Sequence, residues 1–107
     1  MQVAPPPFLG VTLGRLVCAF APARIVLFGS YAKGTACADS DVDLLVVADL
    51  EGDPVAHARR ARQLTADSFP RVDVVLCRSG DLSESELTRS AFLLSVLGSG
   101  ITVYSRG

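Results

Sequence analysis

Residues 28–47 read FGSYAKGTACADSDVDLLVV, and this stretch decides both the fold and the position of the chemistry. A Gly-Ser pair, Gly29-Ser30, ends one apolar run. After ten intervening residues, Asp41 and Asp43 open a second apolar run. A strand tip that offers backbone N–H groups, beside a strand that begins with paired carboxylates, suits a metal-bound triphosphate.

The rest of the chain divides into short apolar runs and longer segments with helical spacing or capping residues. The short runs predict strands over residues 24–28, 42–48, 72–77 and 101–104. The longer segments predict helices over residues 8–21, 53–68 and 83–98, with a single helical turn at 30–33. Asp53-Pro54 and the capping box Ser83-x-x-Glu86 mark two of the helix starts. The order predicts an α/β or α+β domain, built on a small mixed sheet flanked by helices.

Two of the predicted strands, 42–48 and 72–77, are apolar on both faces, so both are expected to be buried. The chain has 107 residues, which predicts one domain over residues 8–107 after a Pro-rich, flexible lead at 1–7. Half of its residues are hydrophobic and its mean hydropathy is +0.40, which is high for this size and leaves apolar surface for a partner.

Charge and cysteine usage exclude several classes of protein. The net charge is −1 and the pI is about 5.7, which argues against general binding to nucleic acid. No run of 18 uncharged apolar residues occurs, so no membrane span is expected. Three scattered cysteines without a CxxC motif, and a single histidine, do not make a zinc site. They indicate free thiols in the cytoplasm.

The Gly29-Ser30 pair has a chemical and a purely structural interpretation. Gly29 allows a sharp turn and lets a phosphate approach without a Cβ in the way. Ser30 adds a hydroxyl and can cap the following helical turn, whose N–H groups favour an anion. Lys33 can reach a phosphate or simply be exposed. Taken alone, the pair is more often only a tight turn with a cap.

Asp41 and Asp43 are the strongest candidates for metal ligands. Alternate residues of a strand point to one face, so both carboxylates can bind one hard cation or bridge two. They could instead be solvated residues at the junction of a loop and a strand. Two uncompensated like charges against a buried strand are costly unless a cation neutralises them, which favours the metal.

Asp73 is the third candidate carboxylate, and it lies within the apolar sequence VDVVL. If its strand neighbours the strand at 42–48, it can face Asp41 and Asp43 and complete a two-metal site. A salt-bridged residue at the start of a strand is an equally good interpretation of Asp73 alone. His57 and the arginines at 59, 60 and 62 are interpreted as a solvated helix face.

Together, Gly29-Ser30, Asp41-x-Asp43 and a later Asp73 resemble the DNA-polymerase-β-type nucleotidyltransferase superfamily, and above all its small stand-alone members, the minimal nucleotidyltransferases (MNT family). The resemblance covers nearly the whole chain, through LFGSYAKG, SDVDLLVV and VDVVL. It implies transfer of a nucleoside monophosphate, AMP where ATP is the donor, to a hydroxyl with release of pyrophosphate.

The resemblance also implies roles for residues and partners. It places Gly29 and Ser30 at the triphosphate, Asp41 and Asp43 on two Mg²⁺ ions, and Asp73 as the third ligand or as the base for the acceptor hydroxyl. Minimal members often act as the antitoxin of a helical HEPN toxin encoded beside them, and some adenylylate a tyrosine of that toxin. A complex with such a toxin, or else a homodimer, is therefore expected.

Two other functions remain open from the sequence. The chain could be a non-catalytic antitoxin that neutralises its partner by occlusion, although all three acids are present. It could also modify a small molecule such as an aminoglycoside, but that activity usually needs an extra substrate domain, for which 107 residues leave no room.

Overall fold

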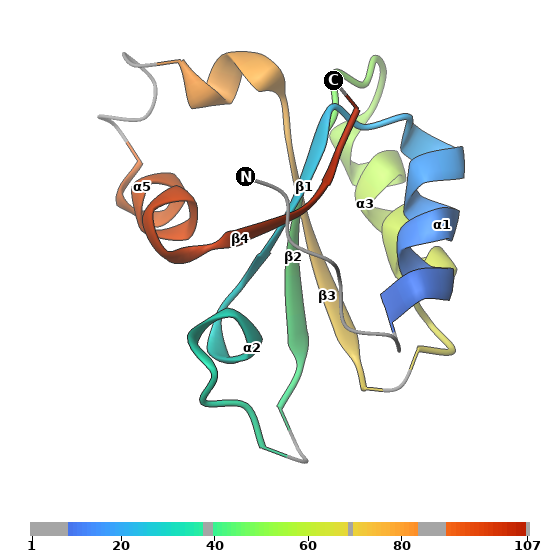
Figure 1. Cartoon of the computed structure of the whole chain (residues 1–107). Coiled ribbons are helices and arrows are strands. Elements are labelled where there is room, and N and C mark those ends of the chain that lie inside the picture. The colour runs from blue at the N-terminus through green and yellow to red at the C-terminus, as the bar shows by residue number, and fades with distance from the viewer. Residues whose placement is uncertain (1–8, 38–39, 69, 84–89, 107) are drawn as a thin grey trace.

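The computed structural model describes residues 9–37, 40–68, 70–83 and 90–106. Four strands form its sheet: β1 (Arg24–Phe28), β2 (Val42–Val47), β3 (Val72–Cys77) and β4 (Ile101–Ser105). The helices are α1 (Gly10–Phe20), α2 (Ser30–Lys33), α3 (Pro54–Leu64) and α5 (Ala91–Ser99), with a 3₁₀ helix η2 (Ser79–Leu82) (Figure 1). The predicted lead at 1–7 lies outside the described residues.

The sheet has the strand order β3-β2-β1-β4. β1 pairs with β2 and with β4 in antiparallel fashion, while β2 and β3 are parallel. A parallel pair needs a crossover connection, and α3 supplies it. The prediction of a small mixed sheet flanked by helices is therefore confirmed.

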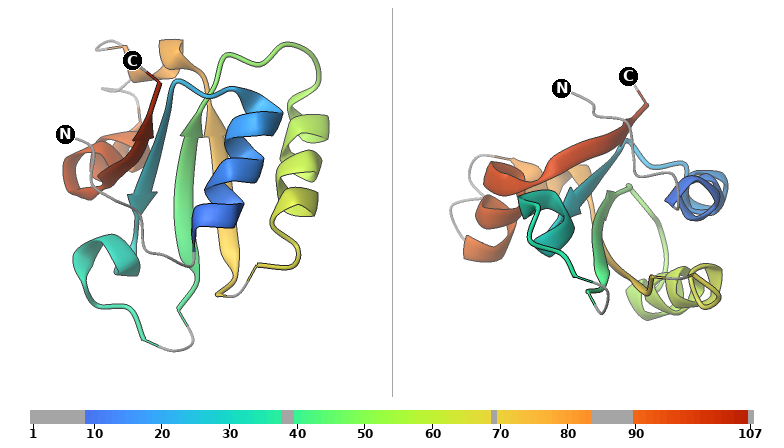
Figure 2. Two further views of the ribbon diagram at one scale, coloured as in Figure 1. Left: turned by 45° about the vertical axis from the view of Figure 1, so that its right-hand side comes forward. Right: turned by 60° about the horizontal axis from the view of Figure 1, so that its bottom comes forward.

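Helices cover the two faces of the sheet unequally. Figure 2 shows α1 and α3 side by side on one face and α5 on the other. The larger core lies under α1 and α3, and it includes Leu16, Ile25 and Leu44. The smaller core lies under α5, around Val26, Leu45 and Val96. α5 is nine residues long and packs against β1.

The expectation that the strand at 72–77 is buried was wrong. β3 is an edge strand, with only Val72 buried and with Asp73 and Val75 exposed. The apolar sequence was interpreted as a strand covered on both faces. In the fold, α1 and α3 cover one face of β3, and the short α5 does not extend over the other.

Two helix boundaries also differ from those predicted. The Asp53 carboxylate caps α3 by accepting a hydrogen bond from the Val55 N–H at 3.0 Å, as expected, but α3 ends at Leu64. A single helix over 83–98 was wrong, because Ser90 is extended and caps α5 through a bond from the Leu93 N–H. The predicted capping partner Glu86 lies outside the described residues. None of the described helices is long and apolar enough to cross a membrane.

Candidate functional site

The turn after β1 is built on Gly29. Its backbone has φ +75° and ψ −153°, a conformation that is essentially open only to glycine. The chain then makes the single helical turn of α2, which Gly34 closes with φ +73°. A Cβ built on Gly29 would collide with the Oδ2 atom of Asp43. The backbone conformation therefore requires glycine at this position, and the Asp43 carboxylate would have to shift to admit a Cβ.

The pairing of the strands aligns the candidate residues in a row. Phe28, the last residue of β1, lies opposite Asp43 in β2. Asp43 in turn lies beside Asp73 in the parallel strand β3. Residues paired in this way point to one face of the sheet, here the face that carries α5. Asp41 comes just before β2 and, two residues from Asp43, shares its side.

The position of Asp43 in this row changes the pKa of its carboxyl group. Burial raises the pKa of the half-buried Asp43 carboxyl, and the charges of Asp73 and Asp41 raise it further. Such a shift is typical of carboxylates that share a site without a cation. The ion pair between Arg71 Nε and Asp73 Oδ1 is long, at 3.9 Å, and both side chains are exposed, so it compensates little of this repulsion.

Carboxylate oxygens are the ligands that Mg²⁺ prefers, so the chemistry of Asp41, Asp43 and Asp73 fits this ion. The three acids lie at the same end of the sheet as Gly29. Nevertheless, within the described part of the chain no three His, Cys, Asp or Glu side chains are close enough to form a ready ligand set. The assignment of these acids to a metal stays a prediction.

Ser30 and Lys33 both lie on α2. Ser30 is the first residue of the helix and Gly29 holds the capping position, so the expectation that Ser30 caps the turn was wrong. This position leaves its hydroxyl for a ligand beside the first N–H groups of α2. Lys33 is exposed in the same short helix. Their assignment to a triphosphate also stays a prediction.

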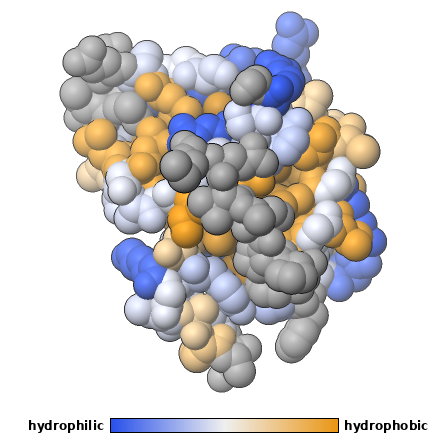
Figure 3. Space-filling model, in the orientation of Figure 1, coloured by the Kyte–Doolittle hydropathy of each residue, from blue (hydrophilic) through white to orange (hydrophobic). Residues whose placement is uncertain are grey.

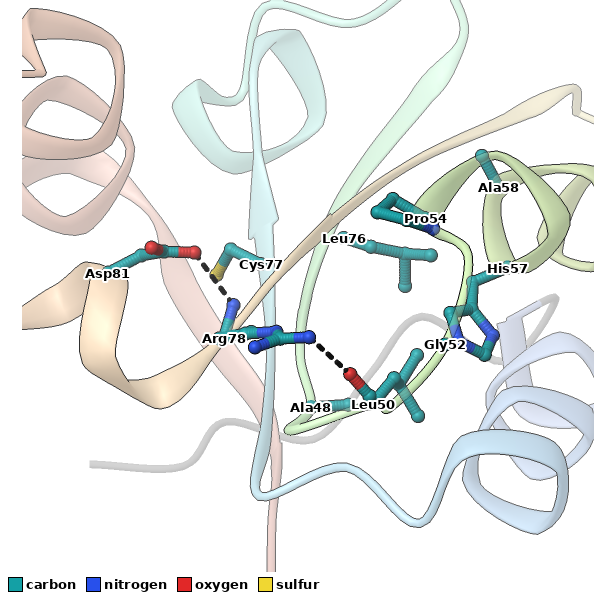
Figure 4. Close-up of a pocket in the computed structure, with 10 residues that line it drawn as sticks. All are labelled: Ala48, Leu50, Gly52, Pro54, His57, Ala58, Leu76, Cys77, Arg78 and Asp81. Carbon is teal, nitrogen blue, oxygen red and sulfur yellow. Dashed lines mark hydrogen bonds between the residues drawn. The ribbon is translucent and has the colours of Figure 1, made fainter.

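A pocket of about 300 Å³ lies at the other end of β2 and β3 (Figure 4). Its lining includes His57, Leu76, Cys77 and Arg78. Ala48, also in the lining, is five residues from Asp43 along the chain, which puts the pocket roughly 17 Å from the acids. The pocket is therefore separate from the predicted site.

Side chains that line this pocket form hydrogen bonds with backbone carbonyls of residues 50 and 51. The Arg78 guanidinium donates a hydrogen bond to the Leu50 carbonyl at 2.8 Å, and burial raises the pKa of the Cys77 thiol to about 11. His57 is half-buried and bonds to the Glu51 carbonyl, so its interpretation as a solvated residue was wrong. Sequence reasoning missed this pocket, although the carboxyl ends of parallel strands are a common place for one.

Comparison with known proteins connects this arrangement to a family. No curated protein matches the chain in sequence. A chain in a crystal structure of a toxin-antitoxin with AMP-PNP is similar, with a TM-score of 0.59 and 26% identity, over 88% of this chain and 71% of that chain. Residues 13–90 match the nucleotidyltransferase domain, and they include the glycine turn and all three acids. Because this match spans well over half of the sequence, the protein belongs to the nucleotidyltransferase domain family.

Proposed function

We propose that the protein is a Mg²⁺-dependent nucleotidyltransferase that moves AMP from ATP to a hydroxyl group. The observation that carries the proposal is the row of groups at one end of the sheet. Gly29 lies against the Asp43 carboxylate, and Asp43 lies in register with Asp73. A glycine turn next to two aligned acids suits a triphosphate that is bound with its metal.

Each group then has a defined role. Backbone N–H groups after Gly29 and the Ser30 hydroxyl bind the phosphates, and the Lys33 ammonium adds positive charge. Asp41 and Asp43 would hold two Mg²⁺ ions, with Asp73 as a third ligand or as the general base. When bound, Mg²⁺ lowers the pKa of the attacking hydroxyl and stabilises the leaving pyrophosphate.

The transfer is an in-line displacement at the α-phosphorus. The acceptor oxygen forms a bond to this phosphorus while its proton passes to the Asp73 carboxylate. The bond from the α-phosphorus to the bridging oxygen breaks, and pyrophosphate leaves with the electron pair. The half-buried position of Asp43 favours this step, because charges interact more strongly away from water.

We further propose that the acceptor is a tyrosine hydroxyl of a HEPN-type toxin encoded nearby, which makes this protein a cytoplasmic antitoxin of the minimal nucleotidyltransferase subfamily. Similarity to a chain of a toxin-antitoxin structure with AMP-PNP supports both the partner and an adenine nucleotide. Exposed apolar residues, Val75 on β3 and Leu94 on α5, supply surface for contact with other molecules. A homodimer is the other arrangement that such surface allows.

The test is the intact mass of the partner after incubation with the protein, ATP and Mg²⁺. The expected result is a gain of one or more AMP units, and no gain when a chelator is present from the start of the incubation. A second tube with the Asp41→Asn/Asp43→Asn double variant controls for transfer by contaminants. An unmodified partner in the complete mixture would contradict the proposed reaction.

A non-catalytic antitoxin is the second candidate, and one observation favours it. Among the described side chains, the acids do not form a ready ligand set. In that case the double variant should neutralise the toxin as well as the wild type does, and the partner should gain no mass. Loss of neutralisation in the double variant would instead support the enzyme.

A further inference from the structure

Phe28 and Phe92 form an aromatic pair beside the predicted site. Phe28 lies opposite Asp43 in the sheet and immediately precedes Gly29. The ring centroids of Phe28 and Phe92 are 5.7 Å apart, and their planes meet at 85°. Phe92 therefore extends the row of Asp73, Asp43 and Phe28 toward α5. A ring from a distant part of the sequence thus reaches the place where phosphates are proposed to bind.

Phe92 is only partly used in packing. Val96 is the buried residue of α5, and Leu93 and Leu97 pack beside it on the sheet. Phe92 lies on the flank of this buried stripe and is 49% exposed. In an edge-to-face pair at least one face of each ring is not covered by the other ring. Phe92 is thus half-exposed and can contact a ligand that lies beside Phe28.

We propose that Phe92 is the stacking platform for the nucleobase of the bound nucleotide. This inference rests on the proposed function, which places the triphosphate at Gly29 and Asp43. A nucleotide held there by its phosphates has its base one ribose away, within reach of the Phe28–Phe92 pair. Aromatic side chains can stack on any nucleobase, because each base has a π face. Figure 3 shows apolar residues at the surface on the side of the molecule where α5 lies, as well as on the side of α1.

A stacking platform has a recognisable specificity. It makes no hydrogen bond to the edge of the base, so it distinguishes bases by their stacking area. Adenine and guanine nucleotides should bind with similar affinity, and both should bind more tightly than cytosine and uracil nucleotides.

The chain contains no tryptophan, so a single substitution makes a specific reporter. In Phe92→Trp, AMP-PNP with Mg²⁺ should quench the fluorescence, while inorganic tripolyphosphate should not. Leu94→Trp is the matched control, because Leu94 is equally exposed, at 49%, on the opposite flank of α5. Quenching of equal depth in both variants would overturn the assignment of Phe92.

The second measurement is the binding affinity, determined by calorimetry for the same two ligands, AMP-PNP with Mg²⁺ and inorganic tripolyphosphate. Phe92→Ala should weaken AMP-PNP binding about tenfold or more, and leave tripolyphosphate binding unchanged. Phe92→Tyr should restore the AMP-PNP affinity, and Leu94→Ala should not change it. Circular dichroism verifies that each variant is folded.

The outcomes separate this inference from the function on which it rests. If wild type binds both ligands and Phe92→Ala keeps full affinity for AMP-PNP, the stacking role is wrong while the nucleotide site stands. If Phe92→Ala weakens only the complex with a partner protein, Phe92 belongs to a protein interface and the inference is likewise overturned. If wild type binds neither ligand, both the proposed function and the stacking role fail.

Discussion

Gly29 combines two constraints that usually occur apart. Its positive φ excludes other residues on conformational grounds, and the Asp43 carboxylate fills the space where a Cβ would lie. A close approach between backbone and carboxylate has a clear use if both bind the same metal–phosphate group. Without a bound ligand, the same arrangement only places the Asp43 carboxylate against a turn. Such a contact is unfavourable, because burial of a charged group without a partner costs free energy.

Gly29→Ala should therefore abolish nucleotide binding and also destabilise the fold, by about 1–3 kcal/mol for the backbone conformation alone. Gly34→Ala is the matched control, since Gly34 has φ +73° but open space around it. The control should lose stability and keep its affinity for AMP-PNP. Urea unfolding and calorimetry measure the two effects. Equal affinity in Gly29→Ala and wild type would reduce the Gly-Ser pair to a turn.

Asp41 and Asp43 are expected to act as one unit. Asp41→Asn and Asp43→Asn should each remove nearly all transfer, and the double variant should lose little more, because residues that act together contribute non-additively. Asp53→Asn, which changes an acid on the far side of the fold, serves as the control. Transfer rates with labelled ATP measure the effect. Near wild-type turnover in either single variant would contradict the metal assignment.

Asp43→Asn should remove the transfer activity but increase the stability of the fold. The pKa of Asp43 is raised in the folded state, so ionisation of this carboxyl costs the folded state more than the unfolded chain. Without metal, Asp43→Asn should therefore raise the free energy of unfolding at pH 7. The gain should fade as the pH drops through the pKa of Asp43, where wild type becomes protonated. Urea unfolding in EDTA at several pH values tests the sign.

At the scale of elements, strand and helix positions follow closely from local patterns. β1 and β3 have the predicted limits, and α3 begins at the predicted Asp53 cap. The exposure of β3 could not be predicted, because it depends on how far α5 extends over the sheet. The start of α5 at Ala91 could not be predicted either. The Ser83-x-x-Glu86 pattern is an equally good capping signal, and it predicts an earlier start.

The candidate site also has features that the sequence predicts and one that it does not. The sequence pattern predicted that the glycine turn and the acids of neighbouring strands lie near one another, and this holds for Gly29, Asp43 and Asp73. The contact of Phe92 with Phe28, the residue opposite Asp43, could not be predicted. It arises from the docking of a helix that follows Asp43 by 48 positions, and no local pattern encodes it.

The cap of α3 gives a prediction that belongs to one element. Asp53→Ala removes the hydrogen bond to the Val55 N–H and should lower the free energy of unfolding by about 1 kcal/mol. Glu51→Ala, an exposed acid two residues earlier, should leave it unchanged. Thermal or urea unfolding distinguishes the two variants. A similar loss in both would mean that charge near the helix, and not the cap, sets the stability.

At the scale of the whole molecule, β2 and β3 separate two regions of different character. Their amino ends carry the acids and adjoin Gly29, while their carboxyl ends line the pocket with Leu76 and Arg78. The two strands are joined over six residue pairs, from Val42 and Val72 to Val47 and Cys77. The sheet is rigidly hydrogen-bonded along this length, so a change of side chain at one end should have little effect at the other.

Arg78→Ala is therefore expected to leave AMP-PNP affinity and transfer unchanged, although it removes the hydrogen bond to the Leu50 carbonyl. The exposed position of Arg78 should limit the loss of stability to less than about 1 kcal/mol. Asp43→Asn provides the contrast in the same assay, with transfer lost and the fold kept. If Arg78→Ala lost as much transfer as Asp43→Asn, the reacting groups would have to lie at the pocket. The assignment of the chemistry to the glycine turn would then be wrong.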